Sequence, residues 1–126
     1  MEIEAFFNSY AKGYSQLDVA RVSAHFTVPF TAIHQGDLSS WEDMASLRDT
    51  TTALLAWYRS QGFLSASHQL DSVLNFGPDA ASARVRWTVQ RQDQPAWEYC
   101  TGYHLKRVDG KWKIYGLVQY QDAPQQ

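Results

Sequence analysis

The sequence predicts an α+β fold in which N-terminal helices pack on a strongly curved antiparallel sheet. Helical spacing of apolar residues dominates the first half of the chain, whereas alternation of apolar and polar residues dominates the second half. A strong two-residue hairpin signal, Asp109-Gly110, separates the last two predicted strands. Helices followed by strands in this order indicate one cone-like scaffold with a pocket inside.

The first predicted helix covers the N-terminal residues and weakens near Gly13. Its apolar positions are Ile3, Phe6, Phe7, Tyr10, Ala11 and Tyr14. Residues 15–18, Ser-Gln-Leu-Asp, form a candidate capping box for a second, short helix. The apolar stripe of that short helix is Val19, Val22 and Phe26. Pro29 stops helix formation, and a short strand is predicted over 30–34.

A turn over 35–37 leads to a long third helix. Residues 40–43, Ser-Trp-Glu-Asp, are the candidate capping box that opens it, and Gly62 ends it. Its apolar positions are Met44, Leu47, Leu54, Leu55 and Tyr58.

Everything after Gly62 is predicted as strand and turn, with strands over 64–76 and 81–91 and a final hairpin. The Asp109-Gly110 turn pairs Val108 with Lys111. Counting back predicts the further pairs Arg107–Trp112, Leu105–Ile114, Tyr103–Gly116, Thr101–Val118 and Tyr99–Tyr120, on the face that meets the helices. The tail over 122–126 is expected to fray.

The opposite face of the hairpin is predicted to be mixed in polarity, with an aromatic and aliphatic centre. It carries Lys106, Lys113, His104, Tyr115, Leu117, Cys100 and Gln119. An antiparallel sheet can leave one face to water, but this face is partly apolar. We therefore expect a homodimer that forms through the outer face of the sheet.

Composition favours one cytoplasmic domain over 1–126. The net charge is −2, which favours neither nucleic acid nor an anionic membrane as a partner. No apolar run approaches the ~20 residues of a membrane span, and the N-terminal sequence carries acid where a signal peptide carries Lys or Arg. Cys100 is the single cysteine, so no intrachain disulfide is expected.

No motif predicts a metal or a cofactor. The four histidines, His25, His34, His68 and His104, lack the HxH and HExxH spacings, and one cysteine offers no zinc pair. The glycines are scattered and form no phosphate-binding loop. Cys100 lies mid-strand, where a small buried thiol is the usual interpretation.

The order of elements resembles the NTF2-like superfamily, which includes SnoaL-like and ketosteroid-isomerase-like proteins. The resemblance covers the chain from about Phe6 to Tyr120. Its best local matches are residues 10–26, the helix opening over 41–47, and residues 108–114 (Val-Asp-Gly-Lys-Trp-Lys-Ile). The resemblance implies a curved sheet around a helix, a conical cavity and frequent dimers. It implies no single activity, because this superfamily hosts many reactions and many pockets without one.

The same resemblance suggests three catalytic candidates. Tyr10 stands where ketosteroid isomerases place an oxyanion-stabilising tyrosine, and Tyr103 matches the face of their second donor, with His104 as the alternative. His34 lies where those enzymes carry a carboxylate base, so steroid isomerisation is not implied. A neutral His can abstract a proton near pH 7, although a histidine at a strand end can equally bond only to backbone or solvent.

Further aromatic and histidine residues are candidates for the pocket wall: Tyr14, Trp41, Tyr58, His68, Trp87 and Tyr120. Such side chains bind flat apolar ligands, but simple aromatic packing would also explain them. His68 shares the inward parity of Leu70 and Leu74, and a structural role is the stronger interpretation for it.

Two functions therefore remain open from the sequence. The first is a SnoaL-like protein that takes a small apolar or aromatic molecule and uses His/Tyr acid–base chemistry as a cofactor-free isomerase or dehydratase. The second is a non-catalytic module that binds a ligand or a protein. A cavity lined by both His34 and Tyr10 would favour the first, and one filled by Trp41, Trp87 and Tyr58 would favour the second.

Overall fold

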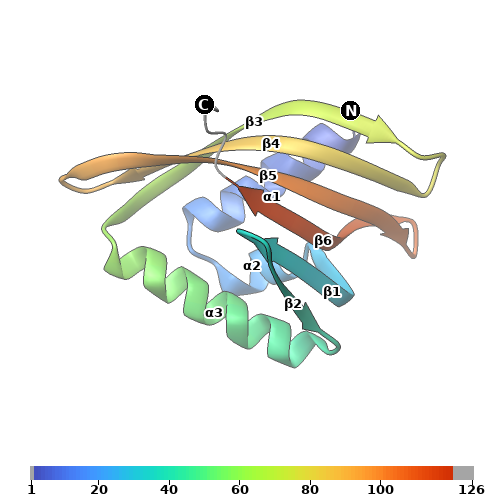
Figure 1. The fold of residues 1–126 in the computed structure, drawn as a ribbon, viewed down its shortest axis with the longest axis horizontal. Helices are drawn as coiled ribbons and strands as arrows, with labels where there is room; N and C mark the ends of the chain where they lie inside the picture. The colour runs from blue at the N-terminus through green and yellow to red at the C-terminus, as the bar shows by residue number, and fades with distance from the viewer. Residues whose placement is uncertain (1, 121–126) are drawn as a thin grey trace.

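The chain folds as three helices on a six-stranded sheet in a computed structural model that describes residues 2–120 (Figure 1). The helices are α1 (Glu2–Ser15), α2 (Val19–Ser23) and α3 (Met44–Ser60). The strands are β1 (Phe26–His34), β2 (Asp37–Trp41), β3 (Phe63–Asn75), β4 (Ala80–Arg91), β5 (Gln94–Val108) and β6 (Lys111–Tyr120). The expected fraying of 122–126 lies outside the described residues.

The sheet has the strand order β2-β1-β6-β5-β4-β3. The four long strands β3 to β6 pair antiparallel with their sequence neighbours, which confirms the prediction for the second half of the chain. β1 pairs parallel with β6, and β2 pairs antiparallel with β1. The sheet is thus mostly antiparallel, and it curves over α1 while α3 runs past the opposite side of the concave space (Figure 1).

Both capping boxes were predicted too early in the sequence. α2 begins after Asp18, whose side chain accepts a hydrogen bond from the backbone N–H of Arg21 at 3.1 Å. α3 begins after Asp43, which accepts from the N–H of Ser46 at 2.8 Å, so Trp41 lies in β2 rather than in the helix. A single aspartate at each N-cap satisfies the exposed N–H groups of the first turn. Phe26, predicted on the stripe of the short helix, is instead the first residue of β1.

The β5–β6 hairpin has the predicted register only near its turn. Asp109 and Gly110 both have positive φ, as a tight two-residue turn requires, and the pairing is as predicted back to Leu105 and Ile114. A β-bulge then leaves Tyr115 without a pairing partner in β5. Beyond it, His104 pairs with Gly116 and Tyr103 pairs with Leu117. The predicted pairs Tyr103–Gly116, Thr101–Val118 and Tyr99–Tyr120 are therefore wrong.

This β-bulge exchanges the two faces of the second half of β6. A one-residue shift moves every following side chain to the other side of a strand. Leu117 and Gln119, predicted on the outer face, line the interior, whereas Val118 pairs with Gly102 and shares the outer face with it. Tyr120 pairs with Cys100 and leaves the inner face for the same reason.

Gly116 is where β1 and β6 approach most closely. A Cβ atom at this position would lie 3.0 Å from Thr31 Oγ1 and 3.4 Å from the Thr31 carbonyl oxygen. Thr31 therefore occupies the space that a side chain at Gly116 would take. A glycine is needed here because the parallel strand β1 packs against it.

Replacing Gly116 by Ala should lower the free energy of unfolding by about 1–3 kcal/mol, because Thr31 and the strand behind it must shift. Gly102→Ala is the matched control, since a Cβ there meets no atom within 4 Å on the same outer face. Urea unfolding of both variants measures the difference. Equal stabilities for the two variants would contradict the close approach of β1 to Gly116.

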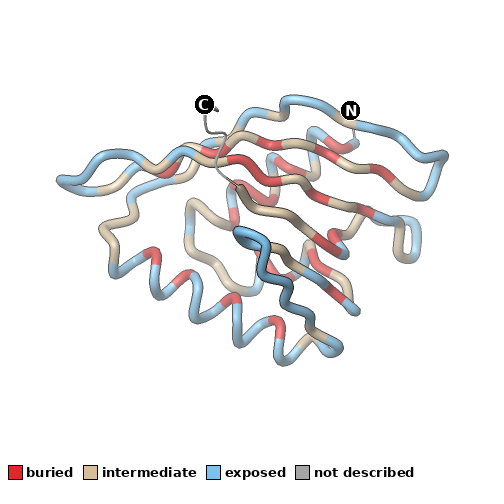
Figure 2. Tube along the Cα trace, in the orientation of Figure 1, coloured by how far each residue is buried: buried red, intermediate tan, exposed pale blue. Residues whose placement is uncertain are grey.

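The core lies between α1 and the concave face of the sheet, as the buried stretches in Figure 2 indicate. Its fully buried large side chains include Phe7, Tyr10, Leu105 and Ile114, each with at most 1 % of its surface exposed. Arg107 ties the start of α1 to the hairpin, because its guanidinium binds Glu2 at 2.6 Å and lies 4.4 Å from the Trp112 ring. Among residues 2–120, no helix is long and apolar enough to cross a membrane.

Candidate functional site

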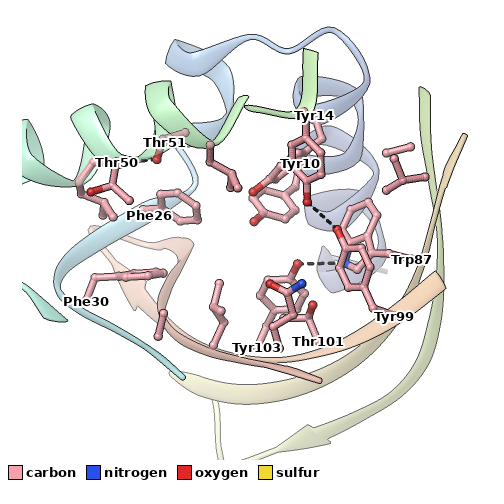
Figure 3. Close-up of a pocket in the computed structure, with 18 of the residues that line it drawn as sticks. Tyr10, Tyr14, Phe26, Phe30, Thr50, Thr51, Trp87, Tyr99, Thr101 and Tyr103 are labelled. Carbon is pink, nitrogen blue, oxygen red and sulfur yellow. Dashed lines mark hydrogen bonds between the residues drawn. The ribbon is translucent and has the colours of Figure 1, made fainter. Parts of the chain in front are cut away.

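A cavity of about 160 Å³ opens between α1, α3 and the concave face of the sheet (Figure 3). The helices contribute Tyr10, Tyr14, Leu47, Thr50, Thr51, Leu54 and Tyr58. The strands contribute Phe26, Phe30, Ala32, Trp41, Phe63, Ala66, Trp87, Val89, Tyr99, Thr101, Tyr103, Leu117 and Gln119. A mainly apolar hollow with a few polar groups is the usual form of a small-molecule site.

One end of the cavity is a cluster of aromatic rings built on α1. Tyr10 and Tyr14 stand one helical turn apart, with ring centroids 5.1 Å from each other. The Tyr10 ring also meets the rings of Tyr103 and Trp87, at 5.6 and 6.0 Å in edge-on geometry. These contacts fix Tyr10 against the sheet and give the cavity a rigid wall.

Two hydrogen bonds orient the polar groups of this wall. The buried Trp87 indole donates through Nε1 to the hydroxyl oxygen of Tyr103 at 3.0 Å (Figure 3). The hydroxyl groups of Tyr58 and Tyr99 lie 3.0 Å apart and join α3 to β5. Because Trp87 occupies an acceptor position of Tyr103, the Tyr103 proton is available to another oxygen.

All five tyrosines of the cavity are held in the neutral form. Burial, followed by the proximity of Tyr103 and Tyr14, raises the pKa of Tyr10 well above its usual value. Burial is also the main cause that raises the pKa values of Tyr14, Tyr58, Tyr99 and Tyr103. Near neutral pH these residues can donate hydrogen bonds to a ligand oxygen but cannot act as bases.

These tyrosines are the only ionisable side chains of the cavity in the described part of the chain, where no Asp, Glu, His, Cys, Lys or Arg lines it. The same residues, 2–120, contain no group of three or more His, Cys, Asp or Glu side chains that could hold a metal ion. The arrangement suits binding of an apolar molecule through hydroxyl donors, with no base beside the bound molecule.

His34 does not lie in this cavity with Tyr10 and Tyr103, contrary to the expectation that the three converge. It is exposed at the end of β1 and lines a second hollow of about 190 Å³. That second hollow, termed the outer hollow, is also lined by Gln35, Trp57, Tyr58, Trp97, Glu98, Tyr99, Gln119 and Tyr120. The outer hollow shares Tyr58, Tyr99 and Gln119 with the first cavity, termed the inner cavity.

The remaining predicted residues divide between these places. Tyr14, Trp41, Tyr58 and Trp87 line the inner cavity as expected, whereas Tyr120 lines the outer hollow. His68 lines neither: its ring lies 5.6 Å from Trp87, and burial lowers its pKa. The alternative between Tyr103 and His104 is settled for Tyr103, because His104 Nδ1 is 2.8 Å from Ser82 Oγ, away from the cavity.

Several lining residues were not predicted. Leu117 and Gln119 were assigned to the wrong face because the bulge at Tyr115 was not recognised, although the neighbouring Gly116 is a signal for one. Thr101 and Tyr99 were placed on the inner face but not recognised as part of a site. The buried Thr51 was missed because it is polar and so was not counted among the apolar positions of the helix. Its hydroxyl group bonds to the Leu47 carbonyl oxygen within α3.

Comparison with known proteins places the chain among NTF2-like proteins. The family model of the NTF2-like protein DUF6841 matches residues 1–122. No functionally curated protein matches the sequence.

Among solved structures, an NTF-2 like protein of unknown function from Shewanella oneidensis MR-1 aligns with TM-score 0.78 and 13% identity, over 94% of this chain and 95% of that one. A ketosteroid isomerase-like protein from Erwinia carotovora atroseptica aligns with TM-score 0.70 and 15% identity, over 98% and 95%. A proposed scytalone dehydratase from Novosphingobium aromaticivorans aligns with TM-score 0.73 and 16% identity, over 97% and 83%. At these identities the likeness concerns the fold alone.

Proposed function

Because the chain belongs to the NTF2-like family DUF6841 and has an aromatic inner cavity, we propose that it binds a compact, largely apolar molecule carrying one hydroxyl or carbonyl oxygen. The observation that carries this proposal is the lining itself, in which aromatic rings surround neutral tyrosine hydroxyl groups without any acid or base. A cavity of about 150 Å³ in another protein holds benzene, so the 160 Å³ here suits one substituted ring.

Titration with phenol tests this proposal, with benzene as the probe that lacks the oxygen. Phenol should bind with a dissociation constant of about 1 mM or tighter, equivalent to about −4 kcal/mol. It should bind more tightly than benzene because the cavity offers hydroxyl donors. Amide chemical shifts should change at Thr101 and Tyr103, which line the inner cavity. No saturable binding of phenol would reject the proposal.

Catalysis is a second candidate function, favoured by the contact between the two hollows. A ketone that passes Gln119 could present a proton on the carbon next to its carbonyl to His34, while the same carbonyl oxygen, which takes the negative charge, meets Tyr10 or Tyr103. This arrangement corresponds to cofactor-free isomerisation or dehydration, with His34 as the base and the two tyrosines as oxyanion donors.

Proton exchange from the methylene group of 4-hydroxyphenylacetone in D₂O tests the catalytic candidate by NMR. If His34 is the base, His34→Ala should lower the exchange rate by about 10²–10⁴, the usual contribution of a general base. Phenol binding should survive this substitution, since His34 does not line the inner cavity. Wild-type exchange no faster than that in buffer would leave binding as the function.

We also propose a homodimer through the outer sheet face. Leu117, predicted on that face, faces the inner cavity instead, so a substitution there does not test the interface. Val118 does lie on the outer face, together with Gly102 and Ile33. Tyr115, the bulged residue, is 40 % exposed. An outer face with small and apolar residues near its centre suits self-association. A cytoplasmic location stays a prediction from the sequence.

Replacing Val118 by Glu should shift the protein to monomer, because burying an unpaired charge at an interface is costly. Ala45→Glu on the exposed side of α3 adds the same charge elsewhere and serves as the control. Sedimentation velocity at micromolar concentration measures both variants. A monomeric wild-type protein would contradict the dimer.

A further inference from the structure

The outer hollow contains a pair of stacked tryptophans, of which Trp97 packs against the core and Trp57 does not. Trp57, in the last turns of α3, and Trp97, near the start of β5, lie with ring centroids 5.2 Å apart and planes inclined by only 7°. The Arg91 guanidinium lies 4.1 Å from the Trp97 ring. The pair therefore forms a flat, polarised surface beside the hollow.

The exposure of this pair points to a ligand surface. Trp57 is 49 % exposed although it is a large aromatic side chain, and it lies outside the buried core. A large exposed ring of this kind contributes little to folding. Trp57 also tilts against Tyr58, with ring centroids 5.6 Å apart, so the stack is held in a fixed orientation before anything binds.

The outer hollow and the inner cavity are neighbours that share a wall, formed by Gln119 and the Tyr58–Tyr99 pair. These three side chains line both spaces. The Tyr58 and Tyr99 hydroxyl groups are bonded to each other, whereas the Gln119 amide has no side-chain partner among residues 2–120. An amide offers both donors and an acceptor. Gln119 can thus bond to a polar atom in the middle of a molecule that reaches from one space into the other.

We infer that the inner cavity and the outer hollow are two subsites of one site, and that the ligand is an elongated molecule with two planar groups. This inference rests on the proposed binding function and extends its ligand, because the compact ring of that proposal becomes one end of a longer molecule. A compact ring with a hydroxyl or carbonyl oxygen occupies the inner cavity. A second flat, apolar group lies against Trp57 and Trp97, and the linker between the two groups passes Gln119.

Calorimetric titration with phenol and with 4-(2-phenylethyl)phenol tests this inference. Phenol fits the inner cavity alone, while the second probe adds a ring on a short linker. In the wild-type protein the two-ring probe should bind at least about tenfold more tightly, since its second ring removes apolar surface from water against Trp57 and Trp97.

Trp57→Ala should remove most of this gain and leave the phenol dissociation constant unchanged, because Trp57 does not line the inner cavity. Trp57→Phe, which keeps a flat ring, should restore part of the gain. Tyr115→Ala is the matched control, because it removes an aromatic ring of similar exposure from the other side of the sheet. This control should retain the full gain.

The outcomes separate the two proposals. Equal affinity of the two probes in the wild-type protein, or a gain that survives in Trp57→Ala, would overturn the two-subsite inference while phenol binding upholds the proposed function. Failure of phenol to bind would reject both.

Discussion

Replacing Ala32 by Phe should abolish phenol binding while the protein remains folded. Ala32 lies on β1, lines the inner cavity and packs against the core. A phenyl group on its Cβ enters the space that the ligand ring would take. The cavity of about 160 Å³ can accept one ring without displacing its walls. We therefore expect stability to stay level or to rise, by up to about 1.5–3 kcal/mol if the ring packs fully.

Calorimetry with phenol and thermal unfolding measure both parts of this result. The matched control is Ala53→Phe, which makes the same change on the exposed side of α3 and should bind phenol as the wild type does. An Ala32→Phe variant that is folded and still binds phenol with wild-type affinity would place the ligand elsewhere. A strongly destabilised variant would show that the cavity is smaller than its volume indicates, because overpacking costs about 1–3 kcal/mol.

The helix–strand order, except for the short strand β2, and the turn of the final hairpin could be predicted because short-range chemistry determines them. The Asp109-Gly110 turn needs two residues that tolerate positive φ, and the alternation in β4 buries Ala81, Ala83, Val85, Trp87 and Val89 on one face. Tyr10 and Tyr103 could be assigned to one cavity because the helical period places Tyr10 on the inner face of α1 and the alternation along β5 places Tyr103 on the inner face of the sheet.

The bulge at Tyr115 was missed although Gly116 follows it, and an isolated glycine inside a strand often marks a bulge or a close approach of another backbone. β1 packs parallel beside β6 with Thr31 against Gly116, and the pairing on the other side of β6 shifts by one residue at the neighbouring Tyr115. The glycine alone does not give the position or the direction of the shift, because these depend on pairing with strands outside residues 111–120. One unrecognised bulge therefore exchanged Leu117 and Gln119 with Val118 and Tyr120 between the two faces.

The position of His34 was misjudged for a different reason. The resemblance alone assigned it to the place where ketosteroid isomerases carry a carboxylate base. The strand carries it beyond Phe30 and Ala32, which line the inner cavity, to the point where β1 turns into β2, opposite Gln119. A position taken over from a family does not give the distance along this strand, and His34 lies in the neighbouring hollow.

Replacing Tyr103 by Phe should destabilise the protein and weaken phenol binding through the same lost hydroxyl group. Tyr103 and Trp87 are each only 3 % exposed, and the Trp87 indole N–H donates to the Tyr103 oxygen. Phe leaves that buried donor without a partner, which costs about 1–3 kcal/mol. Urea unfolding measures this loss. In the Trp87→Phe background the same substitution should cost less, because no indole N–H is then left unpaired.

The binding effect of Tyr103→Phe depends on the oxygen of the probe. Phenol should lose about 0.5–1.5 kcal/mol of binding free energy, roughly a two- to tenfold increase in its dissociation constant, because one hydrogen bond is lost. Benzene has no oxygen and should bind to Tyr103→Phe as it does to the wild type. If phenol and benzene weaken equally, the Tyr103 hydroxyl acts through the shape of the cavity and not as a donor. An unchanged phenol affinity would place the oxygen of the ligand away from Tyr103, leaving Tyr10 or Gln119 as its partner.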